Sequence, residues 1–251
     1  VVTVFLAATA TKVGVYALVR VIFTIFGGVD LLESLQIRDI LIAMAIVAMF
    51  AGSAVAIYQT NIKRMLAYSS LAQIGYMILG LSMNSVVGVS AGLVHLFNHA
   101  LMKGGLFMVM GCVVYRVGSA KLDDMAGLGK QMPVTMGAFV LGGLSLIGVP
   151  LTVGFVSKWA LIQSVLEKGW WPIAALIVIS SLMAVIYIWR VVEVIYFRTA
   201  PAGNEKVQEA PFMMMIPMIV LIGASYYFGI DGTTTMDVAG RAAEALIGGL
   251  K

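Results

Sequence analysis

The stretch VVGVSAGLVHLFNHALMKGGLFMVMGCVVY, residues 86–115, is apolar almost throughout. It is longer than the roughly 20 residues that a helix needs to cross hydrocarbon, so we expect a tilted or locally distorted membrane helix. Near its centre, His95, His99 and Lys103 follow one another at intervals of four, which places them on one face of the helix. Ionisable side chains are costly in hydrocarbon, so three on one face indicate a functional site. We interpret them as part of a path for protons.

The composition is that of a membrane protein. Of 251 residues, 61% are hydrophobic and 11% are charged, and the mean hydropathy is +1.01. These values exclude an ordinary soluble domain and leave room for about seven membrane spans. The net charge of +4 reflects basic residues in loops and does not indicate a nucleic-acid partner. Cys112 is the single cysteine, and CxxC, P-loop, GxGxxG and HExxH motifs are missing, so we expect no disulfide, metal or bound cofactor.

Hydropathy and helix-breaking residues predict seven spans. They cover about 1–26, 38–59, 65–82, 86–115, 133–166, 171–197 and 212–230. The fifth span is interrupted by GVPLTVG, residues 148–154, because Pro150 lacks an N–H and crowds the preceding turn. Broken helices persist in membranes only where protein or a water-filled cavity satisfies the freed backbone, and they mark ion sites in transporters. Lys158 follows the break closely and is therefore a second candidate site.

We expect residues 1–230 to form one transmembrane domain and residues 231–251 to form an amphipathic tail. On a helix, the tail would carry charged residues on one side and aliphatic residues on the other: Asp237, Arg241 and Glu244 against Leu246, Ile247 and Leu250. The sequence opens with Val1 in place of Met and is apolar from the start. From this we expect a truncated chain whose complete form has further helices.

The distribution of basic residues predicts an orientation. Seven crossings place the loops at 60–64, 116–132 and 198–211 on the same side as the N-terminus, and these loops hold most of the loop lysines and arginines. The opposite side has Arg38 and Lys168 before the tail. By the positive-inside rule the first group is cytoplasmic. We therefore expect a multi-pass protein of the bacterial cell (inner) membrane with its C-terminus outside.

Some ionisable groups inside the predicted spans have structural explanations. Arg20 lies near a helix end, from which its side chain can extend to the interface. Arg190 and Glu193 lie three residues apart near the cytoplasmic end of their span, so we expect them to pair with each other. They are also possible supporting residues for a proton path.

Three lysines, Lys12, Lys103 and Lys158, are too deep for such explanations. Burial disfavours the ammonium form, so a buried lysine can exchange protons more readily, and histidine is suited to relay between such lysines. We expect a proton relay made of Lys12, His95, His99, Lys103 and Lys158. Polar residues of the third span are candidates to hold bridging waters, although serines in membrane helices also serve close packing: Ser69, Ser70 and Gln73.

Five stretches together resemble the proton-conducting membrane subunits shared by multisubunit sodium/proton antiporters (Mrp type) and respiratory NADH–quinone oxidoreductase. They occur in family order across most of the chain: TKVGVYALVR (11–20), TNIKRMLAYSSLAQIGYM (60–77), HLFNHALMKGGLF (95–107), DDMAGLGKQMP (123–133) and GVPLTVGFVSKW (148–159). The HxxxHxxxK helix and the broken helix followed by lysine look most like the Mrp antiporter branch of this family.

The resemblance implies an all-α polytopic fold in which this chain is the C-terminal half of a fourteen-helix core with two inverted repeats. It also implies roles for individual residues. Lys12 would connect two half-channels, His95, His99 and Lys103 would form the central relay, and Lys158 would be the terminal proton-exchanging residue. The family's first glutamate–lysine pair would lie in the missing N-terminal half.

Three functions remain open from the sequence. The first is a proton-translocating subunit of a sodium/proton antiporter complex, with other membrane subunits as partners and protons and sodium as the transported ions. The second is the equivalent subunit of NADH–quinone oxidoreductase or a related redox-driven complex. In neither case do we expect the chain to carry out redox or hydrolytic chemistry itself. The third is a scaffold whose buried charges only lock helices together.

Overall fold

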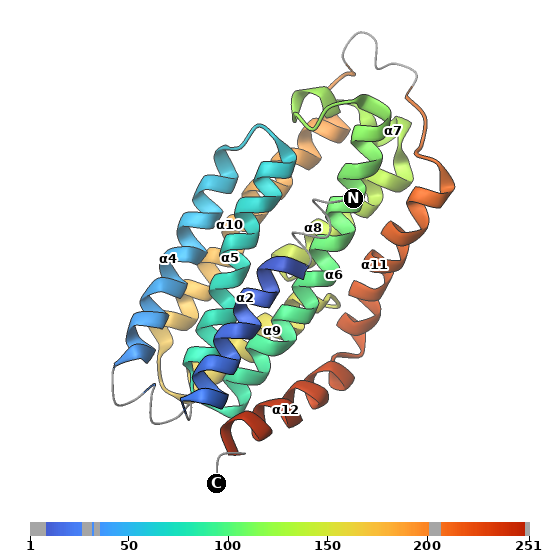
Figure 1. The fold of residues 1–251 in the computed structure, drawn as a ribbon. Helices are drawn as coiled ribbons and strands as arrows, with labels where there is room; N and C mark the ends of the chain where they lie inside the picture. The colour runs from blue at the N-terminus through green and yellow to red at the C-terminus, as the bar shows by residue number, and fades with distance from the viewer. Residues whose placement is uncertain (1–8, 27–31, 33–35, 201–206, 249–251) are drawn as a thin grey trace.

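The computed structural model describes residues 9–26, 32, 36–200 and 207–248, and these form helices joined by short loops (Figure 1). In chain order the helices are α2 (Thr11–Val19), the π-helix η2 (Arg20–Ile25), α4 (Ile37–Tyr58), α5 (Ile62–Ser82), α6 (Val86–Val117), the 3₁₀ turn η3 (Asp123–Met125), α7 (Leu128–Gln131), α8 (Pro133–Ile147), α9 (Val153–Glu167), α10 (Trp171–Phe197), α11 (Phe212–Ile230) and α12 (Gly232–Gly248). Within the described ranges, the only strand-like pairing is an isolated bridge between Asn61 and Lys121.

Five of these helices are long and apolar enough to cross a membrane: α4, α5, α6, α10 and α11. The other two predicted spans correspond to α2 with η2, and to the pair α8 and α9. The start of the first span, residues 1–8, lies outside the described residues. The prediction of an all-α membrane fold with one broken helix is confirmed.

Helix α6 is the centre of the bundle and contacts α5, α8, α9, α11 and α12 (Figure 1). Helices α4 and α5 lie side by side at one flank, and α11 lies at the other. The α4–α5 contact is close because glycines lie at the crossing. A Cβ added to Gly52 would come within 2.7 Å of the Ala72 nitrogen, and one added to Gly75 within 2.6 Å of the Ala45 oxygen. Small residues at such crossings are a general feature of membrane helix packing.

The break predicted at 148–154 falls between α8 and α9. Helix α8 ends at Ile147, and Gly148 follows with a φ of 93°, a conformation that favours glycine. Leu151 also has a positive φ, of 73°. The two helices overlap closely after the turn, since a Cβ added to Gly154 would lie only 1.8 Å from the Ser145 oxygen. The break therefore depends on glycine on both sides.

The charged loops gather at one end of the bundle, as the crossing count predicted. The backbone of Leu122 donates to Thr60 over 2.8 Å, and that of Ile62 donates to Ala120 over 2.9 Å. The Glu209 carboxylate caps the start of α8 by accepting from the Val134 and Thr135 amides. Helix α12 lies at the opposite end (Figure 1).

Helix α12 occupies most of the predicted tail. Asp237, Arg241 and Glu244 are exposed on it, whereas Leu246 and Ile247 are partly buried against a cluster that includes residues of α2, η2, α5 and α6. The observed helix thus has the two faces expected from the sequence. Leu250, the remaining aliphatic residue of that prediction, lies outside the described residues.

Candidate functional site

The polar residues singled out in the sequence converge where α5, α6 and α9 meet. Helix α6 brings its three ionisable residues into the core, and α5 and α9 contribute the groups that contact them. The buried polar side chains of this region are Ser69, Ser70, Gln73, His95, Asn98, His99, Lys103, Ser157 and Lys158.

Lys103 is fully buried against α5. Its Nζ donates to the Leu66 oxygen over 2.7 Å and contacts the Ser69 hydroxyl. Ser70 donates to the same Leu66 oxygen over 3.0 Å instead of reaching Lys103. Among the described residues, the recorded partners of this ammonium are a carbonyl and a hydroxyl, with no carboxylate. The charge is therefore stabilised by dipoles alone.

His99 lies one turn before Lys103 and is stacked with His95. The two ring centroids are 6.3 Å apart and the ring planes differ by 4°. Both nitrogens of His99 are buried without a hydrogen-bond partner in the described protein. Because buried polar atoms are nearly always hydrogen-bonded, this imidazole is an exception that calls for a functional explanation.

His95 is held on both sides. Its Nε2 lies 2.9 Å from the Gln73 Oε1, and its Nδ1 lies 2.8 Å from the Ser157 Oγ. An amide oxygen only accepts, so Nε2 carries the hydrogen and Nδ1 accepts from the Ser157 hydroxyl. That hydroxyl also lies 3.2 Å from the Val153 oxygen, so its hydrogen has two acceptors. Gln73 thus contacts the relay directly, where the sequence only indicated a water-holding role.

Lys158 closes the end of the broken helix. Its Nζ donates to the Leu146 and Ile147 oxygens over 2.9 and 2.8 Å, and to the Ser181 Oγ over 2.9 Å. The last carbonyls of a helix have no intrahelical partner, and a cation is favourable at that end of the helix dipole. Lys158 is therefore a structural cap for α8 as well as a buried ionisable group. The sequence placed it after the break but did not reveal this contact.

Lys12 is buried, with 5% of its surface exposed, on α2, which packs against α5. Arg20 is exposed, as expected of a side chain that extends toward an interface. The structure thus keeps Lys12 inside the bundle and Arg20 outside it.

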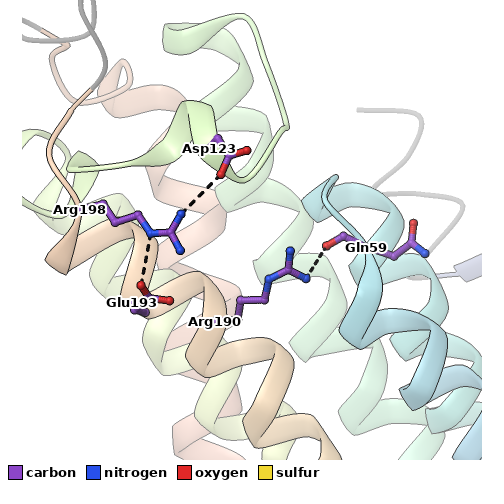
Figure 2. A network of polar contacts seen from close by, with 5 residues as sticks. All are labelled: Gln59, Asp123, Arg190, Glu193 and Arg198. Atoms are coloured by element: carbon purple, nitrogen blue, oxygen red, sulfur yellow. Dashed lines mark hydrogen bonds and ion pairs between the residues drawn. The ribbon is translucent and has the colours of Figure 1, made fainter.

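The predicted pair of Arg190 and Glu193 is wrong (Figure 2). Arg190 donates to the Ile57 and Gln59 oxygens over 2.7 and 3.2 Å, so it caps the end of α4. Glu193 pairs with Arg198 at 3.3 Å, and Arg198 lies 3.7 Å from Asp123. Helix C-terminal carbonyls and a flanking arginine compete better for these side chains than the i, i+3 partner. The network lies at the loop end of α10 (Figure 2), so neither residue contacts the histidines.

The structure adds residues that the sequence did not single out. The ring of Tyr76 contacts both His95 and Lys158. Asn98 donates to the Val153 oxygen over 2.7 Å and so ties α6 to the first residue of α9. A signal existed for Tyr76, which follows Gln73 by three residues and so shares its face of α5, and for Ser157, which precedes Lys158.

Comparison with known proteins agrees with this architecture. The family described as NADH:quinone oxidoreductase/Mrp antiporter, TM matches residues 1–184. NADH-quinone oxidoreductase subunit N of Desulforudis audaxviator is 40% identical over 230 residues, covering 86% of this chain and 45% of the relative. F(420)H(2) dehydrogenase subunit N of Methanosarcina mazei is 32% identical over 256 residues, covering 98% of this chain and 51% of the relative. The chain thus spans about half the length of the curated relatives it matches.

Solved structures share the fold. A chain of the membrane-bound sulfane sulfur reductase (MBS), an archaeal respiratory membrane complex, superposes with a TM-score of 0.86 at 32% identity, covering 98% of this chain and 49% of that one. A chain of the Mrp complex from Dietzia sp. DQ12-45-1b superposes with a TM-score of 0.87 over 96% of this chain and 52% of that one, and its 23% identity is a likeness of fold alone. The resemblance inferred from the five sequence stretches is confirmed, and the chain belongs to the NADH:quinone oxidoreductase/Mrp antiporter transmembrane family.

Proposed function

We propose that this chain is the proton-translocating part of an antiporter-like membrane subunit in a redox-driven respiratory complex, of the kind called subunit N. The observation that carries the proposal is the buried series of Lys103, His99, His95 and Lys158, held by α5, α6 and α9 and without a carboxylate among the recorded partners of the two lysines. Other membrane subunits of that complex would be its partners, and redox chemistry would take place in those or further subunits.

The relatives favour the redox-driven complex over the sodium/proton antiporter of Mrp type. Both relatives described above carry names of dehydrogenase or oxidoreductase N subunits, at 40% and 32% identity. The similarity to the Mrp complex is one of fold, which antiporters and oxidoreductases share. We therefore propose the redox-driven function as the primary one and keep sodium/proton exchange as the competing outcome of the experiment.

The contacts support a transfer route along α6. Lys103 can release a proton toward His99, whose two nitrogens have no partner in the described protein and are free to accept and donate. His95 stacks on His99 and, through the hydrogen bond to Ser157, reaches the residue next to Lys158. Lys158 would exchange the proton at the break. Lys12, buried on the helix that packs against α5, would connect this route to the part of the complete subunit that precedes it.

We also propose that the charged loops face the cytoplasm of a bacterial inner membrane and that the C-terminus lies outside. The gathering of basic loops at the end opposite to α12 supports this orientation.

The test uses inverted membrane vesicles that contain the complete complex, and it follows proton uptake by quenching of a pH-sensitive dye. Uptake is driven either by an electron donor, NADH or reduced F420, or by an imposed sodium gradient. We expect donor-driven uptake to fall at least about tenfold in Lys103→Ala, Lys158→Ala and Lys12→Ala, since a positioned proton carrier contributes on the order of 10²–10⁴ in rate.

Lys130→Ala is the matched control, because Lys130 is exposed in α7. Native gels measure the amount of assembled complex in each preparation. Uptake driven by sodium but not by a donor would assign the chain to the antiporter class. A loss of assembly with normal uptake per assembled complex would assign it to the scaffold class.

A further inference from the structure

Tyr76 lies between the two ionisable groups that would pass a proton from α6 to α9. Its ring centroid is 5.6 Å from that of His95, with the ring planes at 69° in an edge arrangement. The Lys158 Nζ lies 5.0 Å from the same centroid. Tyr76 is only 1% exposed, so both contacts are shielded from solvent. One aromatic ring thus contacts both proton carriers.

The far end of Tyr76 is anchored by other helices. Its hydroxyl donates to the Ser180 Oγ over 3.0 Å, and the Ser180 hydroxyl donates to the Met49 oxygen over 3.3 Å. Helices α10 and α4 therefore fix the orientation of the ring. The hydroxyl is engaged in this chain, so the ring itself is what Tyr76 offers to His95 and Lys158.

The ring adds a contact that the hydrogen bonds of Lys158 do not supply. An ammonium has three N–H donors, and those of Lys158 have three acceptors, the Leu146 and Ile147 oxygens and the Ser181 hydroxyl. To give up a proton, the ammonium must release one acceptor. A cation over an aromatic face is attracted by the ring quadrupole, and more strongly where water is excluded. The ring therefore holds the charged group in place while a hydrogen bond opens.

We propose that Tyr76 is a positioning residue for proton transfer between His95 and Lys158, in which one ring holds the ammonium and orients the imidazole. This inference rests on the proposed function, because it presupposes that both groups carry protons. It assigns the effect to the ring and not to the phenolic hydroxyl. Tyr76 would act through Lys158 and His95 without accepting a proton itself.

The experiment replaces Tyr76 in the complete complex with phenylalanine and with mono-, di- and trifluorophenylalanine. Fluorine withdraws the electron density that attracts a cation while changing the ring's size very little. We expect Phe to restore at least about half of the wild-type proton uptake per electron, and the trifluoro ring to lower uptake about tenfold relative to Phe, as expected for loss of a desolvated cation–π contact. Ring packing alone predicts a flat series, which would overturn the proposal.

Two further variants keep the inference falsifiable. Ser180→Ala frees the phenolic hydroxyl and leaves the ring in place, and we expect uptake within about twofold of wild type, since a neutral hydrogen bond contributes little. A loss in Ser180→Ala as large as that in the trifluoro variant would assign the effect to the hydroxyl and refute a role of the ring. Lys158→Ala is measured in parallel. Normal uptake in that variant would refute the proposed function, whereas loss there combined with a flat fluorine series would refute the Tyr76 inference alone.

Discussion

The two buried lysines solve the same problem in different surroundings. Both Lys103 and Lys158 place an ammonium against backbone oxygens and a serine hydroxyl. The Leu66 oxygen lies in the first half of the continuous helix α5, whereas the Leu146 and Ile147 oxygens are the last carbonyls of α8. Lys103 thus adds a bond to a helix that is already complete, while Lys158 supplies partners that the broken helix lacks. The break depends on its lysine more than the continuous helix does.

The largest expected effect concerns the break itself. In Gly154→Ala the new methyl group would lie 1.8 Å from the Ser145 oxygen, so α8 and α9 must move apart. We expect a loss of about 3 kcal/mol in the free energy of unfolding, since overpacking against backbone lies at the upper end of such costs. Denaturant titration of the purified complex in detergent measures it.

The matched control is Gly137→Ala in α8, where an added Cβ meets no atom within 4 Å. Alanine is the better helix former, so a gain of up to about 1 kcal/mol is expected there. Equal behaviour of the two glycine variants would contradict the close crossing at the break.

The second prediction compares the lysines directly. Lys158→Ala and Lys103→Ala both remove a buried charge, so the relief of its desolvation largely cancels between them. Lys158→Ala alone removes a donor from two terminal carbonyls, and we expect it to destabilise the complex by about 2 kcal/mol more than Lys103→Ala. The comparison is made by denaturant titration at one pH. A larger effect of Lys103→Ala would show that α5 needs its lysine more than the break does.

The third prediction reverses the order at the serines. Lys103 keeps one oxygen acceptor in Ser69→Ala, whereas Lys158 keeps two in Ser181→Ala. We therefore expect a cost of about 1.5 kcal/mol for Ser69→Ala and about 0.5–1 kcal/mol for Ser181→Ala, since hydrogen bonds to charged groups are the stronger ones. The same titrations measure both. A greater loss in Ser181→Ala would mean that the Ile147 carbonyl depends on that hydroxyl more than on Lys158.

The smallest effect is expected at the α4 cap (Figure 2). Arg190 satisfies the Ile57 and Gln59 carbonyls much as Lys158 satisfies those of α8. All three of these residues are only partly buried, so water can replace the guanidinium after Arg190→Ala. We expect a cost of about 0.5–1 kcal/mol, well below that at the break. A cost as large as that of Lys158→Ala would remove burial as the explanation for the difference between the two caps.

The sequence predicted the site through the expense of charge in hydrocarbon. Spacing alone placed His95, His99 and Lys103 on one helix face, and Pro150 with its flanking glycines predicted the break before Lys158. These inferences succeeded because they depend on helix geometry and on local backbone chemistry. The pairing of Arg190 with Glu193 failed because spacing identifies neighbours on one helix but not competing partners on others.

The sequence by itself therefore determined the class of the protein, its helices, the position of the break and the residues that carry charge inside it. Only the tertiary structure decided which groups those residues contact. Gln73, Ser157 and Tyr76 meet His95 from two other helices, and Lys158 reaches carbonyls 11 and 12 positions earlier in the chain. The physical reason is that hydrophobic periodicity and helix breakers act within a segment, whereas hydrogen-bond partners depend on how helices cross. The packing at glycines such as Gly75 and Gly154 fixes those crossings.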